Sequence, residues 1–313
     1  MKKIWLIGTG LMAKEYAKVL KDLSVDFLVI GRGKENSDSF KKETGKNPHI
    51  GGIESFINTK PSLPDAVIVA VGIENLSSTT TSLLNYGIKK ILVEKPGVGY
   101  ASELDELVKK TEEKKADVFL AYNRRFYSSV LKAKELIKED GGVTSFHFEF
   151  TEWSHTIKDL PKHPTEHQNW FLGNSTHVID MAFFLGGNPT EICCFTSGSL
   201  PWHTKSSIFT GAGKTTKNAL FSYCANWESP GRWSVEMLTK KHRFIFKPLE
   251  TLQVQEIGSV AINPILLEDE LDKKYKPGLY LQTKNFLENN IDELCSINEQ
   301  KKNIDLYKKM SNY

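Results

Sequence analysis

Short apolar runs alternate with amphipathic segments along the first 121 residues of the chain. The runs lack internal polar positions, which is typical of parallel strands buried on both faces. Between them apolar residues recur at helical spacing, as at Met12, Tyr16, Val19 and Leu20. This alternation predicts βαβ units and a doubly wound α/β parallel sheet with helices on both faces. The expected strands are residues 4–7, 27–30, 66–71, 91–93 and 118–121, and the expected helices start at residue 11 or span 53–57, 76–86 and 103–114.

Beyond residue 122 the apolar pattern changes. Longer strand candidates follow one another with turns between them, and residues 144–151 alternate as in an open sheet with one solvated face. We therefore expect two domains, a parallel-sheet domain over residues 1–121 and an α+β domain with a large, open, mostly antiparallel sheet over residues 122–313. The second domain's expected strands are residues 144–151, 191–196, 206–210, 219–227, 233–238 and 243–247, and its expected helices are 131–137 and 279–294.

Composition narrows the class of protein. The 313 residues are 40% apolar and 25% charged with a formal net charge of +3, which is ordinary for a globular chain. No Lys/Arg run marks a nucleic-acid surface, and no apolar run approaches the ~20 residues of a membrane span. The four cysteines form no C-x-x-C pair, and His163 and His167 lack a third nearby ligand. We expect a cytoplasmic protein that binds no metal, nucleic acid or membrane.

A glycine-rich turn follows the first predicted strand. Residues 8–13 read G-x-G-x-x-A between that strand and the first helix, the context in which this motif indicates dinucleotide binding. Gly8 permits the tight turn, Gly10 lets the backbone approach a pyrophosphate, and Ala13 lets the helix pack on the strand. The helix N-terminus offers N–H groups to the phosphates. The contacts expected from this turn are Gly8, Thr9, Gly10, Leu11 and Met12.

The end of the second predicted strand indicates which dinucleotide is bound. An NAD site usually places Asp or Glu there for the ribose 2′-hydroxyl, but this chain has Gly31, Arg32, Gly33 and Lys34. Arg32 suits stacking on adenine or pairing with a 2′-phosphate, and Ser37 offers a hydroxyl. The pattern favours NADP over NAD, and the alternative is an exposed loop whose charges bind nothing.

A lysine follows the fourth predicted strand. Lys95 stands in Glu94-Lys95-Pro96, directly after residues 91–93. The C-terminal ends of parallel strands face the ligand crevice, so Lys95 is expected on the nicotinamide side. Its charge suits stabilisation of an alkoxide that develops on a substrate oxygen. By composition alone, an ordinary surface lysine is the competing interpretation.

Several motifs occur in one order over essentially the whole chain. They are G-x-G-x-M-A at residues 8–13, Glu94-Lys95-Pro96, residues 122–126 (YNRRF), and His177-x-x-Asp180. The combination resembles the Gfo/Idh/MocA family, named after glucose–fructose oxidoreductase, inositol dehydrogenase and rhizopine catabolism. The resemblance implies a Rossmann domain joined to an α+β domain whose open sheet packs against a partner subunit, giving a homodimer or tetramer. It also implies that Lys95 contacts nicotinamide and substrate, and that the Lys95–Pro96 bond is cis.

A histidine stands at the start of a predicted helix. Asn174 or Ser175 is expected to cap this helix, so that the dipole of the first turn favours a neutral His177 able to accept a proton. The resemblance likewise implies a catalytic His177, against the alternative of a structural histidine. Asp180, one helical step on, either orients the ring or is an exposed helix residue. Many family members carry an acid four positions before the histidine, where this chain has Gly173.

The resemblance implies that either Arg124 or Arg125 binds an anionic substrate group, the alternative being an interdomain ion pair. The segment Trp153–Trp170 is rich in His, Lys and aromatic residues and is expected to form a loop beside the site, where Trp170 and Gln168 line a sugar pocket. Asn174 is expected to orient the substrate. With Lys95 and His177 these complete the substrate contacts. The cofactor site is further expected to include Gly31, Arg32, Gly33, Ala70, Val71, Gly72, Asn75, Glu94, Lys95 and Asn123.

The expected reaction is hydride transfer between NADP, or NAD, and a hydroxyl-bearing carbon of a sugar or sugar derivative. The cofactor does the redox chemistry, Lys95 polarises the oxygen and His177 exchanges the proton. Two alternatives remain open, a cofactor-binding regulator that has lost catalysis and a redox-neutral enzyme that uses a bound cofactor transiently. A biliverdin-reductase-like activity fits less well, because Lys95 and His177 suit an alcohol.

Overall fold

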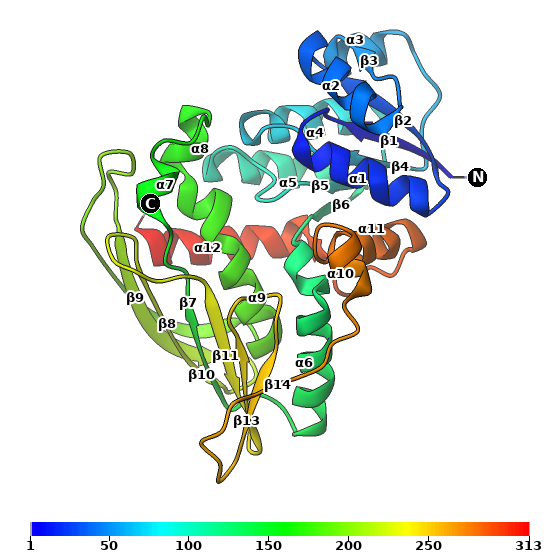
Figure 1. Cartoon of the computed structure of the whole chain (residues 1–313). Helices are drawn as coiled ribbons and strands as arrows, with labels where there is room; N and C mark the ends of the chain where they lie inside the picture. Colours follow the sequence, from blue (N-terminus) through cyan, green and yellow to red (C-terminus); the bar gives the residue numbers. More distant parts are fainter. Residues whose placement is uncertain (1, 313) are drawn as a thin grey trace. The chain divides into compact units, whose positions relative to one another are not determined.

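The computed structural model of the chain describes residues 2–312, which fall into two compact units (Figure 1). Unit 1 contains the chain up to Asn123 together with Lys274–Lys302, and unit 2 contains Arg124–Lys273 together with the chain from Asn303 on. Among the described helices, none has the length and apolar character needed to cross a lipid bilayer.

Unit 1 is built on a seven-stranded sheet in which every strand but one is parallel to its neighbours. The four central strands are apolar runs buried on both faces, as their sequence predicts. The predicted Rossmann sheet is therefore confirmed. In sheet order the strands are β15 (Cys295–Ser296), β6 (Asp117–Leu120), β5 (Lys90–Val93), β4 (Ala66–Val69), β1 (Lys3–Ile7), β2 (Asp26–Gly31) and β3 (His49–Ile50).

The helices of unit 1 follow the predicted alternation, with one addition. Helix α2 (Lys34–Thr44) was not expected, because its sequence is almost entirely polar and buries a single large apolar side chain, Phe40. One short 3₁₀ turn precedes α4, another precedes α5, and a third follows β6. The helices are α1 (Leu11–Asp22), α2 (Lys34–Thr44), α3 (Gly52–Asn58), α4 (Leu76–Tyr86), α5 (Leu104–Glu113) and α11 (Leu279–Glu288).

After most of unit 2, the chain returns to unit 1 over Lys274–Lys302. The predicted division into domains 1–121 and 122–313 does not include this return. Helix α11 packs on α1, where the Gln282 amide donates to the Tyr16 hydroxyl at 3.1 Å. Strand β15 then pairs antiparallel with β6 at the sheet edge. Helix α11 also ends before the predicted residue 294, because Asn289 adopts a left-handed φ of 65°.

Unit 2 is built on an eight-stranded sheet that is antiparallel except for the pairing of β7 with β10. The predicted open, mostly antiparallel sheet is confirmed. Its order is β14 (Asn263–Pro264), β13 (Gln253–Glu256), β12 (His242–Phe246), β11 (Ser234–Leu238), β7 (Ser145–Glu149), β10 (Leu220–Asn226), β9 (Ile208–Thr215) and β8 (Pro189–Ser197).

One face of this sheet is covered by helix α9 (Thr176–Gly186), as Figure 1 shows. Phe183 of α9 packs edge-on against Phe146, Phe148 and Phe221, with ring centroids 5.1–5.9 Å apart. This aromatic core fixes the start of α9, where His177 stands, relative to the strands. The other helices with residues in unit 2 are α6 (Ser128–Glu139), α7 (Ser154–Ile157), α8 (Pro164–Gln168), the π-helical turn η4 (Phe171–Ser175), α10 (Glu270–Lys274) and α12 (Ile297–Ser311), which begins in unit 1.

Candidate active site

The glycine turn between β1 and α1 is shaped for a ligand that approaches the backbone. Gly8 has φ +119°, and a Cβ there would lie 2.1 Å from the Ala70 carbonyl oxygen, so only glycine fits. A Cβ built on Gly10 would meet no described atom within 4 Å, which leaves that backbone open. Gly10 is the N-cap of α1, and no side chain of the described part caps this helix. Its first N–H groups are therefore available to an anion, as a pyrophosphate requires.

Two predicted cofactor residues meet beyond the strand ends of unit 1. The exposed Arg32 guanidinium, after β2, donates to the Asn75 side-chain oxygen at 3.2 Å. Ser37 lies beside the same turn, but its hydroxyl is buried and donates to the Gly33 carbonyl at 2.7 Å. The expectation that Ser37 adds a hydroxyl to the cofactor site is therefore revised, because that hydroxyl serves the first turn of α2.

Lys95 stands directly beyond β5, in a loop fixed on both sides. The preceding Glu94 accepts a hydrogen bond from the Tyr16 hydroxyl at 2.8 Å. The following Lys95–Pro96 bond is cis, as the family resemblance implied. The Pro96 carbonyl accepts from the Gln300 amide at 2.9 Å, and Tyr122 donates to the other end of Gln300 at 3.1 Å. Lys95 is thus held at the C-terminal edge of the sheet.

Tyr16 keeps its proton under all ordinary conditions. Burial raises its pKa well above the usual value, and the charge and hydrogen bond of Glu94 raise it further. The phenol therefore stays a donor to the Glu94 carboxylate. Sequence analysis placed Tyr16 only on the buried face of a helix, and no local pattern connects it with Glu94, 78 positions away.

Residues 123–125, which follow β6, each bind a different partner. Asn123 donates to the Pro277 carbonyl within unit 1 at 2.8 Å. In unit 2, the Arg124 guanidinium lies 4.9 Å from the centre of the Trp233 ring. Arg125 is buried and binds Asp180 through two hydrogen bonds, of 2.9 Å and 2.6 Å.

Arg125 and Asp180 are therefore reassigned. A bidentate pair whose side chains are 4% and 1% exposed holds both partners in place, since separating it would leave a buried charge. Arg125 is committed to Asp180 and not to a substrate anion, and Asp180 is neither an exposed helix residue nor dedicated to orienting His177. The pair forms within unit 2.

The start of helix α9 differs from the predicted capped terminus. The turn η4 runs directly into α9, and Thr176 donates to the Leu172 carbonyl at 2.8 Å. Ser175 has helical φ and ψ and makes no capping hydrogen bond. The prediction that Asn174 or Ser175 caps the helix is therefore wrong, and the dipole argument for His177 loses its basis. The His177 ring is buried and lies 6.3 Å from the Trp233 ring, between centroids.

A buried carboxyl group, Glu152, binds the residues just before α9. Its oxygens accept from the Asn174 amide at 3.0 and 3.1 Å and from the Ser175 hydroxyl at 2.8 Å. The Arg232 guanidinium lies 3.5 Å from the same carboxylate. A carboxylate thus stands beside Asn174, although Gly173 occupies the position where many relatives carry one. Sequence analysis missed Glu152, because nothing near it in the chain relates it to residues 22 and 23 positions away.

Burial raises the pKa of Glu152 to about 7, from an ordinary value of 4.5. The loss of hydration outweighs the hydrogen bond from Ser175, the positive charge of Arg232 and the hydrogen bond from Asn174, all of which favour the ionised form. The group therefore changes charge near neutral pH. Perturbed carboxyl groups of this kind cluster at functional sites.

Trp170 belongs to an aromatic cluster rather than to an open surface. Its ring is 7% exposed and packs edge-on against Trp202, with centroids 6.0 Å apart. Trp202 in turn stacks parallel to the buried Trp227, at 5.9 Å. Trp170 thus supports other tryptophans, and little of its surface is left to line a sugar pocket as predicted.

A pocket of about 780 Å³ opens beside this cluster, entirely within unit 2. Its walls include the tryptophans Trp153, Trp202 and Trp227, and Glu152 contributes to its lining. Residues 153–158 of this lining belong to the aromatic segment that was expected beside the site. The other walls, from the turn at residues 200–202 and the β10–β11 connection, follow from no local sequence pattern.

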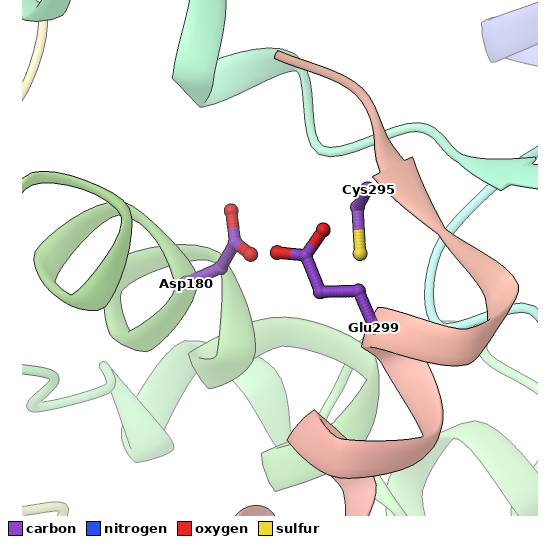
Figure 2. A group of neighbouring side chains, drawn as sticks. All are labelled: Asp180, Cys295 and Glu299. Atoms are coloured by element: carbon purple, nitrogen blue, oxygen red, sulfur yellow. The ribbon is translucent and has the colours of Figure 1, made fainter. Parts of the chain in front are cut away.

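The Cys295 thiol of unit 1 lies beside the Glu299 side chain, with the sulfur and a carboxylate oxygen within 4.8 Å of each other (Figure 2). Asp180, drawn in the same figure, belongs to unit 2 and is bound there by Arg125. A thiol and one carboxylate are fewer donors than the four of a structural zinc site, so we assign no metal to this pair.

Residues 2–122 match the Gfo/Idh/MocA family model, described as an oxidoreductase family with an NAD-binding Rossmann fold. No curated protein matches the chain. Among solved structures, levoglucosan dehydrogenase in complex with NADH and levoglucosan is similar, with a TM-score of 0.80 and 16% identity, covering 99% of this chain and 96% of that chain.

Two further structures share this likeness. UDP-N-acetylglucosamine 3-dehydrogenase from Acidithiobacillus ferrooxidans has a TM-score of 0.76 at 12% identity, covering 99% of this chain and 97% of that chain. A dehydrogenase from Clostridium difficile has a TM-score of 0.78 at 19% identity, covering 99% of both chains. At these identities the likeness shows the fold. The family model covers the part of the chain that contains the glycine turn and Lys95, and this part forms most of unit 1.

Proposed function

We propose that the protein is an NAD(P)-dependent dehydrogenase that oxidises a hydroxyl group, or reduces the keto group, of a sugar or sugar derivative. The observation that carries the proposal is the glycine turn, where Gly8 admits no side chain and the Gly10 backbone is open at an uncapped helix start. Similar proteins named as levoglucosan and UDP-N-acetylglucosamine dehydrogenases support a sugar as substrate.

The residues of unit 1 fit a dinucleotide. We assign its binding to the residues at the C-terminal ends of the parallel strands and in the glycine turn. When bound, the cofactor supplies hydride transfer. The assigned residues are Gly8, Thr9, Gly10, Leu11, Met12, Gly31, Arg32, Gly33, Ala70, Val71, Gly72, Asn75, Glu94, Lys95 and Asn123.

Two groups carry the catalysis in this proposal. The Lys95 ammonium stabilises negative charge on the substrate oxygen, and the loop anchored at Glu94 and Pro96 keeps it beyond β5. The His177 imidazole exchanges the proton of the substrate hydroxyl. Glu152 positions the segment before α9, and thereby His177, through Asn174 and Ser175. Arg124 and Asn174 remain our assigned substrate contacts.

We further propose that NADP is preferred to NAD. Strand β2 ends at Gly31 with no carboxylate, and two cations, Arg32 and Lys34, follow it. Helix α2 begins at Lys34 with Gly33 as its N-cap, so backbone N–H groups face the same region. These features favour the additional negative charge of a 2′-phosphate over a ribose hydroxyl.

We also propose a homodimer or tetramer that forms through the sheet of unit 2. The strand face opposite α9 carries exposed apolar groups, among them Phe195 on β8 and Leu220 on β10, which are 63% and 60% exposed. Sedimentation that gives the mass of a monomer would contradict this arrangement.

The function is tested by following absorbance at 340 nm while the protein is offered NAD or NADP with a panel of aldoses, polyols and glycosides. We expect oxidation of at least one sugar, lost in His177→Ala. Cofactor binding without turnover of any sugar would instead indicate a regulator. A cofactor retained through purification, with a sugar converted but no net reduction, would indicate the redox-neutral alternative.

A further inference from the structure

The pocket of unit 2 has aromatic walls that the proposed chemistry does not use. Trp153 is 49% exposed, and its indole N–H donates to the Gly231 carbonyl at 3.0 Å, which fixes the plane of the ring. Trp202 is held by its stacking on Trp227 and by a hydrogen bond of 2.9 Å to the Ser154 hydroxyl. Rigid, partly exposed indole faces in a concave site suit a flat apolar surface, such as the C–H face of a pyranose ring.

The pocket also offers a hydrogen-bond acceptor for the hydroxyl groups of a bound ligand. Glu228 lies exposed in the wall, whereas the Glu152 carboxyl group is 1% exposed and already accepts from Asn174 and Ser175. Carboxylate oxygens accept hydrogen bonds from hydroxyl donors. The exposed Glu228 carboxylate also disfavours a phosphate, and Lys158 and His155 are the basic groups of the lining. The lining therefore fits an uncharged polyhydroxylated ring better than a nucleotide.

A continuous series of contacts joins this pocket to the histidine. The Arg232 guanidinium lies 4.7 Å from the Trp153 ring centre and 4.5 Å from that of Trp233. Trp233 lies 6.3 Å from His177, between ring centroids. From the other side, Glu152 reaches Asn174 and Ser175, immediately before the helix of His177. All of these residues belong to unit 2.

We propose that this pocket is a subsite for a second, uncharged sugar ring, so that the substrate is a glycoside or disaccharide whose other ring is oxidised near His177. The inference rests on the proposed function for the identity of the oxidised ring, but binding of the second ring does not depend on turnover. Stacking on Trp153 supplies affinity, and the exposed Glu228 carboxylate selects hydroxyl donors.

Calorimetric binding to the whole protein with saturating NADP tests the subsite. The probes are glucose, galactose, maltose, cellobiose, lactose, trehalose and UDP-glucose. We expect at least one disaccharide to bind about tenfold or more tightly than either monosaccharide, and UDP-glucose to bind no better than the monosaccharides. Trp153→Ala should weaken the disaccharide about tenfold and glucose less than twofold.

Matched variants separate stacking from general damage. Trp153→Phe keeps an aromatic face and should recover most of the affinity, whereas Leu266→Ala, at a side chain 96% exposed outside the pocket, should change nothing. Equal binding of mono- and disaccharides, no binding of any probe, tighter binding of UDP-glucose, or no effect of Trp153→Ala would overturn the subsite. Disaccharide binding that needs Trp153, with no sugar oxidised, would uphold the subsite and refute the dehydrogenase.

Discussion

Replacing Glu152 by glutamine tests the electrostatics of the cluster before helix α9. The carboxyl group is 1% exposed and accepts from Asn174 and Ser175. Glutamine has nearly the same shape but cannot ionise. The variant should therefore keep the fold and remove one pH-dependent contribution to the free energy of unfolding.

The size of that contribution follows from the pKa of Glu152, which burial raises from 4.5 to about 7. Because the pKa is raised in the folded state, the folded protein binds the proton more tightly than the unfolded chain does. The resulting stability is fully present below the unfolded pKa and is lost as the pH rises through 7. Between pH 5 and pH 8 the loss amounts to about 2.5 kcal/mol.

Urea unfolding followed by tryptophan fluorescence measures this loss. Five of the six tryptophans (153, 170, 202, 227 and 233) lie in unit 2, so the signal reports the unit that contains Glu152. The wild type should lose about 2.5 kcal/mol more than Glu152→Gln on going from pH 5 to pH 8. Glu256→Gln, at an exposed position on β13, is the control and should parallel the wild type. Parallel curves for the wild type and Glu152→Gln would refute the reasoning.

Three further predictions address separate parts of the account. Gly8→Ala places a Cβ 2.1 Å from the Ala70 carbonyl oxygen at φ +119°, so it should weaken NADPH binding at least about tenfold by calorimetry; unchanged affinity would contradict the role of the turn. Arg32→Ala should weaken NADPH binding about 10- to 100-fold and NADH binding less than threefold, and equal losses would refute a contact with the 2′-phosphate. Arg125→Ala leaves Asp180 buried and should cost about 3–5 kcal/mol in urea unfolding, partly restored by adding Asp180→Asn; a loss below about 1 kcal/mol would count against a buried ion pair.

Local patterns were sufficient for much of unit 1. The buried runs at β1, β4 and β5 and the turn at Gly8 depend on neighbours in sequence, so period and motif identify them. The position of Lys95 beyond β5 follows from the same logic. Helix α2 could not be predicted, because its polar sequence has almost no periodic apolar positions.

Contacts between distant segments could not be predicted in this way. Glu152 reaches Asn174 from the end of another strand, and Arg125 reaches Asp180 across 55 positions. Such pairings are set by how the sheet and α9 pack, which no local pattern encodes. The predicted helix cap at Asn174 or Ser175 was wrong for a related reason. Ser and Asn are typical of helix starts, but the same side chains can donate to a buried carboxylate, as both do to Glu152.

The central claim is most directly tested by comparing Lys95→Met with the wild type in two assays on the same preparation. Calorimetric titration with NADPH measures cofactor binding, and absorbance at 340 nm with the best sugar of the panel measures turnover. The account predicts that Lys95→Met binds NADPH within about threefold of the wild type while turnover falls at least about 10³-fold. Unchanged turnover, with the cofactor still bound, would contradict the assignment of this chain's chemistry to Lys95.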